Sequence, residues 1–163
     1  MMSVDQRISR LHSVIDDSRL PEDDNWLNPE IDEIFSFDTP SEILRELEKS
    51  SSPWAKETSK LLHKRSPLML HVSLRQIKLG RHMSLADELR LERTLVQHCF
   101  YTNHLQRVGA QTETVEGIRA LAIDKDHSPT WNPARIEDVT TSMVDPFFES
   151  PWLEDEHPLA DLK

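Results

Sequence analysis

Apolar residues recur at helical spacing along most of this chain, and polar residues fill the positions between them. Near the N-terminus one apolar stripe indicates a helix over about residues 3–18, and it consists of Val4, Ile8, Leu11 and Ile15. The same spacing predicts further helices at residues 29–36, 40–47, 53–64, 67–80 and 85–100. The pattern therefore favours an all-α fold.

Small polar residues mark where these helices begin. Six that directly precede a proline are Asn28, Thr39, Ser52, Ser66, Asn132 and Ser150. A side chain that accepts a hydrogen bond from a free N–H, followed by a residue that needs no N–H, is typical of a helix start. We expect five helix starts and, at Ser150, a turn. Thr39 and Glu42 predict a capping box, and Ser84 with Asp87 predicts the start of the 85–100 helix.

The pattern differs in three further segments of the chain. The 67–80 helix has apolar residues at so many positions that we expect burial on more than one side. Residues 101–111 form a polar loop whose length and composition favour disorder or adaptation. Thr112 or Thr114 then caps a helix whose inward residues we expect to be Val115, Ile118, Leu121 and Ala122.

The C-terminal part is predicted to hold short elements and a tail. Asn132-Pro133 predicts a short helix that carries Ile136 and Val139, and Thr140 caps a last turn that delivers Phe147 and Phe148. The end of the chain is too acidic and polar to pack by itself. We therefore divide the chain into an N-terminal helix with an acidic loop (1–27), a helical domain (28–152) and a flexible acidic tail (153–163).

Composition supports helices and narrows the range of partners. Only three glycines occur, whereas hairpin-rich folds use many in tight turns. With 29 acidic and 19 basic residues the net charge is -10, which disfavours binding to nucleic acid or to an anionic membrane. No apolar run approaches the roughly 18 residues that span a bilayer, and the N-terminus shows neither a signal core nor a transit peptide. We expect a soluble chain.

Cys99 is the single cysteine, so it cannot form an internal disulfide and indicates an intracellular protein. It lies within an apolar helical pattern. This position favours a buried thiol over a catalytic nucleophile, because the sequence fixes no basic partner near it.

The run from Glu116 to Asp126, EGIRALAIDKD, followed by Pro129 and Trp131, is the most specific motif of the chain. It resembles the C-terminal signature of the 3-hydroxyisobutyryl-CoA hydrolase branch of the crotonase (enoyl-CoA hydratase/isomerase) superfamily, in its fungal type. Weaker similarities in the family's order extend the resemblance over residues 28–152.

The resemblance implies an activity and also a missing part. The family hydrolyses an acyl-CoA thioester in mitochondrial valine catabolism, with the acyl-CoA as substrate and no tightly bound cofactor. Its oxyanion hole and catalytic carboxylates belong to an N-terminal core of β-β-α turns, which stabilises the charge on the thioester oxygen. None of Gly80, Gly109 and Gly117 matches the glycine-bearing loops of that core. We therefore expect no catalytic residue in this chain.

The signature residues allow structural and functional interpretations. Arg119 and Lys125 could contact the phosphates of coenzyme A, while the structural alternative pairs them with Glu116, Asp124 or Asp126. Glu116 fits a helix N-terminus better than a catalytic base, and Gly117 predicts close packing against a neighbouring helix. We expect no metal site, because the histidines are scattered and the two aspartates lack a third ligand.

Two functions from different classes follow. The first is the C-terminal part of a 3-hydroxyisobutyryl-CoA hydrolase-like protein, inactive alone. The second is a non-catalytic helical interaction module, such as a mitochondrial ribosome-associated relative of the family. Under both hypotheses we expect the apolar helix faces to contact the missing crotonase core, another protein or a second copy of this chain. An independent helical protein is the third alternative.

Overall fold

The computed structural model describes residues 29–162, which are mostly helical and fall into two compact units divided between Ser36 and Phe37. The first unit contributes α2 (Pro29–Ile34), which ends in a turn where Ser36 Oγ donates to the Glu33 carbonyl (2.7 Å). The helix predicted over 3–18 and the boundary after residue 27 lie outside the described residues. Within those residues the all-α prediction is confirmed.

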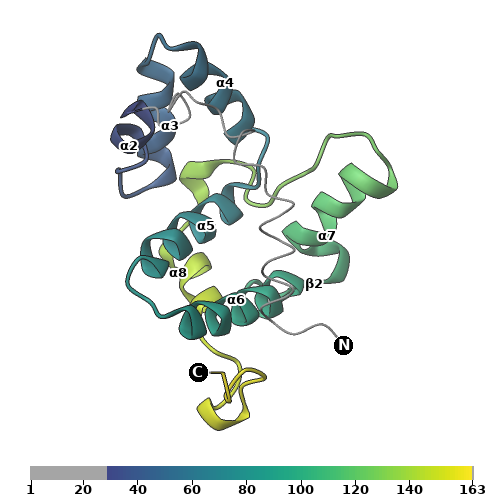
Figure 1. The fold of residues 1–163 in the computed structure, drawn as a ribbon. Coiled ribbons are helices and arrows are strands. Elements are labelled where there is room, and N and C mark those ends of the chain that lie inside the picture. Colours follow the sequence, from purple (N-terminus) through teal and green to yellow (C-terminus); the bar gives the residue numbers. More distant parts are fainter. Residues whose placement is uncertain (1–28, 163) are drawn as a thin grey trace, which may run out of the picture. The chain divides into compact units, whose positions relative to one another are not determined.

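The second unit carries the remaining elements (Figure 1). Its α-helices are α3 (Pro40–Lys49), α4 (Pro53–Leu62), α5 (Pro67–Gly80), α6 (Leu85–Phe100), α7 (Glu113–Ile118) and α8 (Thr141–Val144). Two-residue strands β1 (Tyr101–Thr102) and β2 (Arg107–Val108) form an antiparallel pair. The 3₁₀ turns are η3 (Asn103–Leu105), η4 (Gly109–Gln111), η6 (Ile136–Asp138), η7 (Asp145–Phe148) and η8 (Glu154–Glu156), and η5 (Arg119–Ile123) is a π-helical turn.

The predicted caps at the starts of α3 to α6 are present. Thr39 accepts the Glu42 N–H (3.2 Å) and the Glu42 carboxylate accepts the Thr39 N–H (3.0 Å), which completes the capping box. Ser52, Ser66 and Ser84 each accept an N–H three residues further on. The start predicted at Asn132-Pro133 is wrong: that peptide bond is cis, and the next helical turn is the short η6.

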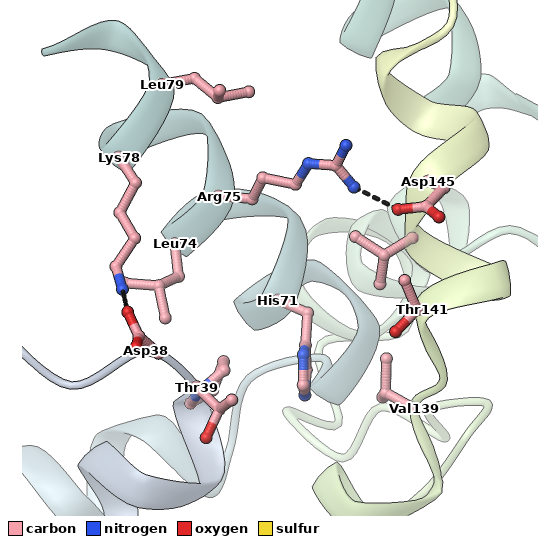
Figure 2. Close-up of a pocket in the computed structure, with 12 residues that line it drawn as sticks. Asp38, Thr39, His71, Leu74, Arg75, Lys78, Leu79, Val139, Thr141 and Asp145 are labelled. Atoms are coloured by element: carbon pink, nitrogen blue, oxygen red, sulfur yellow. Dashed lines mark hydrogen bonds and ion pairs between the residues drawn. The ribbon is translucent and has the colours of Figure 1, made fainter. Parts of the chain in front are cut away.

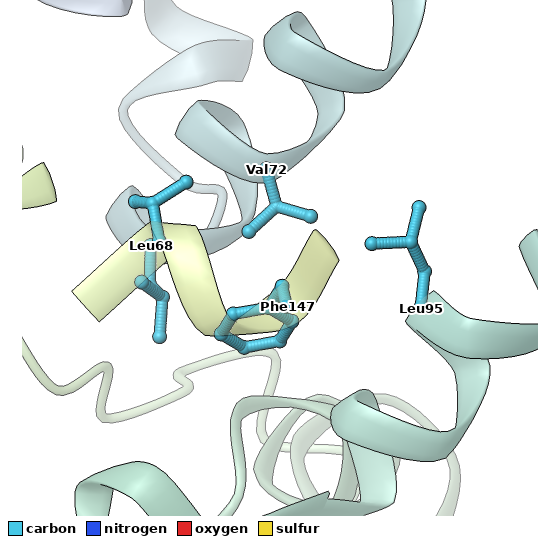
Figure 3. Close-up of a cluster of buried hydrophobic side chains, with 5 residues drawn as sticks. Leu68, Val72, Leu95 and Phe147 are labelled. Atoms are coloured by element: carbon cyan, nitrogen blue, oxygen red, sulfur yellow. The ribbon is translucent and has the colours of Figure 1, made fainter. Parts of the chain in front are cut away.

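A small core joins α5, α6 and the segment after α8. Leu68 and Val72 of α5 meet Leu95 of α6 around Phe147, whose side chain is 1% exposed (Figure 3). The cluster also contains Val144 of α8. The predicted last turn thus delivers Phe147 to the centre of the structure, where an aromatic side chain buries more apolar area than the aliphatic residues around it.

Two histidines hold the segment that carries Phe147. The imidazoles of His98 and His104 lie 6.1 Å and 5.1 Å from the Phe147 ring centre. His98 Nε2 is 2.8 Å from the Glu149 carbonyl oxygen, and His104 Nε2 is 3.0 Å from that of Met143. The α6–hairpin region therefore fixes both ends of the turn that contains Phe147.

The apolar faces expected of α5 and α7 are partly wrong. Leu68 and Val72 are buried, but Ile77 of α5 is 61% exposed. Ile118 and Leu121, expected to face inward, are exposed, and so is Ala122. Ala120 faces the inside instead, on the same face as the buried Glu113 seven residues earlier. The helix then continues as η5, where the Asp124 N–H bonds to the Arg119 carbonyl five residues back (2.8 Å).

Residues 101–111, expected to be disordered or adaptable, form a defined hairpin. Tyr101 pairs with Val108 and Thr102 pairs with Arg107. Thr102 is buried and its hydroxyl donates to the His98 carbonyl (3.0 Å), which ties the hairpin to the end of α6. Local hydrogen bonds to buried polar groups thus order a loop whose composition alone favours disorder.

The C-terminal residues lie along α6. Arg90 donates to the carbonyl oxygens of Leu159, Ala160 and Leu162, and Asp87 accepts its remaining guanidinium contact (2.8 Å). Trp152 packs edge-on against His157 and beneath Arg93. The segment predicted as a flexible acidic tail is thus anchored through one arginine and one aromatic side chain.

Candidate functional site

The signature residues form one hydrogen-bonded cluster centred on Arg119. Its Nε and Nη2 donate to the two carboxylate oxygens of Glu116 (2.8 Å each), and Nη1 donates to Asp124 (2.6 Å) and Asp126 (2.7 Å). Nη2 also donates to the Ser128 carbonyl (3.3 Å). An arginine has five N–H donors, and all five are engaged here. Arg119 thus ties α7 to the loop that follows η5.

The charges of this cluster stabilise one another. The two hydrogen bonds from Arg119, together with that from the Thr130 N–H (2.7 Å), lower the pKa of Glu116 to about 2. The same contacts raise the pKa of Arg119, and Arg119 lowers the pKa of Asp126. Three carboxylates surround one guanidinium, so the cluster carries an excess of negative charge.

Gly117 and Trp131 close the back of this cluster. A Cβ on Gly117 would lie 3.4 Å from the Trp131 ring, and the indole N–H donates to the Lys64 carbonyl (3.1 Å). The close packing predicted for Gly117 is present, but its neighbour is the tryptophan of the following loop and not a helix. The Trp131 side chain therefore lies against α7 at Gly117.

Lys125 stands apart from the ion pairs around it. It is exposed and adopts the left-handed backbone conformation (φ 56°), as does His127 (φ 53°). Asp124 and Asp126, its neighbours in sequence, both form ion pairs with Arg119. Within residues 29–162 no ion pair involves Lys125, so its ammonium group faces solvent.

A buried carboxylate next to this cluster is not indicated by the sequence. Glu113 is 7% exposed, accepts hydrogen bonds from the Ser66 hydroxyl and the Asn132 N–H (2.9 Å), and lies 3.8 Å from Arg107. Burial raises its pKa, against the effect of these donors. Ser66 is 47 residues away in sequence, and no local pattern reports such a contact.

Glu113 and Glu116 both line a cavity of about 490 Å³ between the hairpin and the 130–132 loop. Their pKa values are shifted in opposite directions, a feature that acid–base pairs in active sites share. Here each carboxylate is already held by donors of the protein itself. The geometry therefore assigns both a structural role, which joins α5, α7 and the loop.

A second cavity, of about 470 Å³, lies between the starts of α3 and α8 and one side of α5. Figure 2 shows two ion pairs at its wall: Lys78 with Asp38 (2.6 Å) and Arg75 with Asp145 (2.5 Å). His71 points from α5 toward Thr39 and Val139. Its Nε2 is buried without a hydrogen-bond partner, and burial lowers the pKa of the imidazole.

Other chemistry finds little support in residues 29–162. No group of three or more His, Cys, Asp or Glu side chains is placed to hold a metal ion there. Burial raises the pKa of the Cys99 thiol, although Thr114 opposes this, so the thiolate that a nucleophile requires is disfavoured. None of the helices in this part of the chain has the length and apolar character to cross a membrane.

His71 should make stability depend on pH. The folded protein holds its imidazole neutral, while the unfolded chain binds a proton near pH 6.5, so stability is lost as pH falls through that value. We expect His71→Gln to flatten the decline in the free energy of unfolding between about pH 7.5 and 5. Urea denaturation across this range measures it. His82→Gln, at an exposed histidine, should keep the wild-type slope; parallel curves for His71→Gln and wild type would contradict this assignment.

The Glu116–Arg119 pair should contribute more than an exposed ion pair of the same kind. Glu116→Gln removes a bidentate, charge-assisted contact and should lower the melting temperature at pH 7. Glu137→Gln is the matched control, because it removes a carboxylate from the exposed Arg135 pair (3.4 Å). Since the folded pKa of Glu116 lies near 2, the difference from wild type should disappear as pH falls from about 4.5 toward 2. Equal melting temperatures of the two variants would refute the larger contribution expected of the Glu116–Arg119 pair.

Comparisons with known proteins agree with the signature. A family model described as enoyl-CoA hydratase/isomerase matches residues 2–148. The chain is 41% identical over 137 residues to the probable 3-hydroxyisobutyryl-CoA hydrolase 2 of Arabidopsis thaliana, which covers 82% of this chain and 34% of the relative. It is 37% identical over 119 residues to the mitochondrial 3-hydroxyisobutyryl-CoA hydrolase of Gallus gallus (73% and 29%) and 35% identical over 120 residues to that of Homo sapiens (74% and 29%).

The chain therefore spans about a third of the length of the curated relatives that it matches. The match of the family model over nearly the whole chain, the identity to these hydrolases and the helical structure around the signature lead to one conclusion. This chain belongs to the enoyl-CoA hydratase/isomerase family.

Proposed function

We propose that this chain is the C-terminal helical region of a 3-hydroxyisobutyryl-CoA hydrolase, and that it supports thioester hydrolysis without supplying a reacting group. The observation that carries the proposal is the 41% identity over 82% of the chain to a relative of which the match covers only 34%. The substrate would be a short acyl-CoA thioester of valine catabolism, bound as substrate and not as a resident cofactor.

The engaged state of the carboxylates supports a non-reacting role. Hydrolysis of a thioester requires hydrogen-bond donors aimed at the developing oxyanion and a carboxylate free to activate water. Glu116, Asp124 and Asp126 are bound to Arg119, and Glu113 is buried against Ser66 and Asn132. In this arrangement the acidic residues of the signature hold the loop in place.

Lys125 is the better candidate of the two cations predicted to contact coenzyme A. Arg119 has no remaining donor, so a phosphate could reach it only by displacing a carboxylate. The Lys125 ammonium group is exposed at the tip of the loop. We propose that it contacts a coenzyme A phosphate, and that Arg119 positions the loop which presents it.

The similarity to these relatives also bears on the location of the protein in the cell. Two of the relatives compared, from chicken and human, are described as mitochondrial. We propose a mitochondrial location for this protein.

A non-catalytic interaction module is the alternative function. The many exposed apolar side chains on α5 to α7 favour it, because such side chains are stabilised by contact with a partner protein.

A chimera tests the proposed function. The 137-residue matching region of the Arabidopsis relative would be replaced by the corresponding region of this chain, and release of free coenzyme A from 3-hydroxyisobutyryl-CoA would be measured. We expect the chimera to hydrolyse the substrate and the 163-residue chain alone to show no turnover.

Two controls make this test decisive. The Arabidopsis relative without the matching region should be inactive, which shows that the helical region is needed. A folded but inactive chimera would refute the hydrolase assignment, whereas hydrolysis by the 163-residue chain alone would refute the supporting role.

The same chimera tests Lys125. Lys125→Ala should raise KM for the acyl-CoA several-fold and leave kcat unchanged, because a phosphate contact distant from the thioester strengthens ground-state and transition-state binding equally. Lys60→Ala, at an exposed lysine of α4, is the matched control. An unchanged KM for Lys125→Ala would exclude the contact.

A further inference from the structure

The helix α6 is apolar on two opposite sides. One side carries Leu91, Thr94 and Leu95, of which Thr94 and Leu95 are buried, and it packs against the core around Phe147. The other side carries large apolar residues that remain exposed: Leu85 (72%), Leu89 (36%), Val96 (52%) and Phe100 (41%). We call these four residues the outer stripe of α6.

The outer stripe is a continuous feature and not a set of scattered side chains. Its spacings of four, seven and four residues place all four side chains within about 60° of one another around the helix. It extends along about 24 Å, the full length of this 16-residue helix. At its end Tyr101 (54% exposed) follows Phe100 directly and pairs with Val108 (56%) across the hairpin.

A helix with two apolar sides is stable in water only when both are covered. Single exposed apolar residues are normal on a soluble protein, but a contiguous row marks an interface. The described part of the chain covers the side that faces Phe147 and leaves the outer stripe uncovered. The outer stripe is therefore a candidate interface.

A second copy of this chain paired antiparallel fits the stripe poorly. Glu92 and Arg93 flank the stripe on opposite sides, each about 50° from its centre. Two α6 helices paired antiparallel about a two-fold axis would place Glu92 beside Glu92 and Arg93 beside Arg93. The net charge of -10 adds long-range repulsion between copies.

The length of the relatives indicates what covers the stripe. The stripe lies inside the region that the family model matches, and the hydrolases that share it have about two-thirds of their length elsewhere. We propose that the outer stripe of α6 is the surface on which that remaining part of a 3-hydroxyisobutyryl-CoA hydrolase packs. This inference rests on the proposed function and specifies which face of the helical region makes the contact.

Cysteine labelling tests the contact without relying on activity. Val96→Cys and, separately, Ile77→Cys would be introduced in a Cys99→Ser background, both in the 163-residue chain and in the chimera described above. Ile77 is the matched control, because it is 61% exposed and lies on α5 away from the stripe. Rates of reaction with a maleimide would be followed at each site by peptide mass spectrometry.

We expect the thiol of Val96→Cys to react at least tenfold more slowly in the chimera than in the 163-residue chain, and the thiol of Ile77→Cys to react at the same rate in both. Unchanged labelling of the Val96→Cys variant, or equal slowing of both variants, would overturn the proposal. A dimer of the 163-residue chain in which the Val96→Cys thiol is already protected would identify a second copy as the occupant and would overturn it too.

The same labelling separates this contact from the proposed function. If the chimera hydrolyses the substrate while its Val96→Cys thiol stays reactive, only the contact is refuted. If that thiol is protected in an inactive chimera, only the proposed function is refuted.

Discussion

The burial of Phe147 is the interaction on which the second unit depends. This side chain arrives from the C-terminal part of the chain and fills the space between α5 and α6, where Leu68, Val72 and Leu95 surround it. The helices themselves bury few large residues, so most of the hydrophobic stabilisation at their junction comes from this one ring and its neighbours. His98 and His104 then fix the turn that delivers it, through the carbonyls of Glu149 and Met143.

Hydrogen bonds and ion pairs hold the signature residues together, as the burial of Phe147 holds α5 and α6 together. Arg119 satisfies Glu116, Asp124 and Asp126 together, and so a helix, a π-helical turn and a loop become one rigid piece. Such a cluster contributes geometric specificity, since each planar pair fixes the orientation of both partners. The residue pattern that resembles an acid–base or phosphate site is in this structure chiefly a means of holding the loop and of exposing Lys125 at its tip.

The sequence predicts local features well and distant contacts poorly. Caps at Thr39, Ser52, Ser66 and Ser84 follow from residues within three positions, so the beginnings of α3 to α6 are evident from the sequence. The π-helical turn at Arg119–Ile123 is not, because propensity does not distinguish it from a continued α-helix. The inward face predicted for this helix is wrong because the buried residues are Glu113 and Ala120, and a carboxylate is not expected on a buried face. The partnership of Glu113 with Ser66 joins residues 47 apart, which no periodicity reports.

The small core and the exposed apolar residues of the helices have the same explanation under the proposed function. Under the proposed function, this region is part of a larger protein, where faces such as the outer stripe of α6 would gain stability from contact with the rest. The charged residues Glu92 and Arg93 on its two flanks keep the stripe narrow. A partner would therefore bind it in a defined orientation. The helical region can then be built for two tasks at once: its inner faces hold Phe147 and the signature loop, and its outer face locates that loop relative to the remainder of the protein.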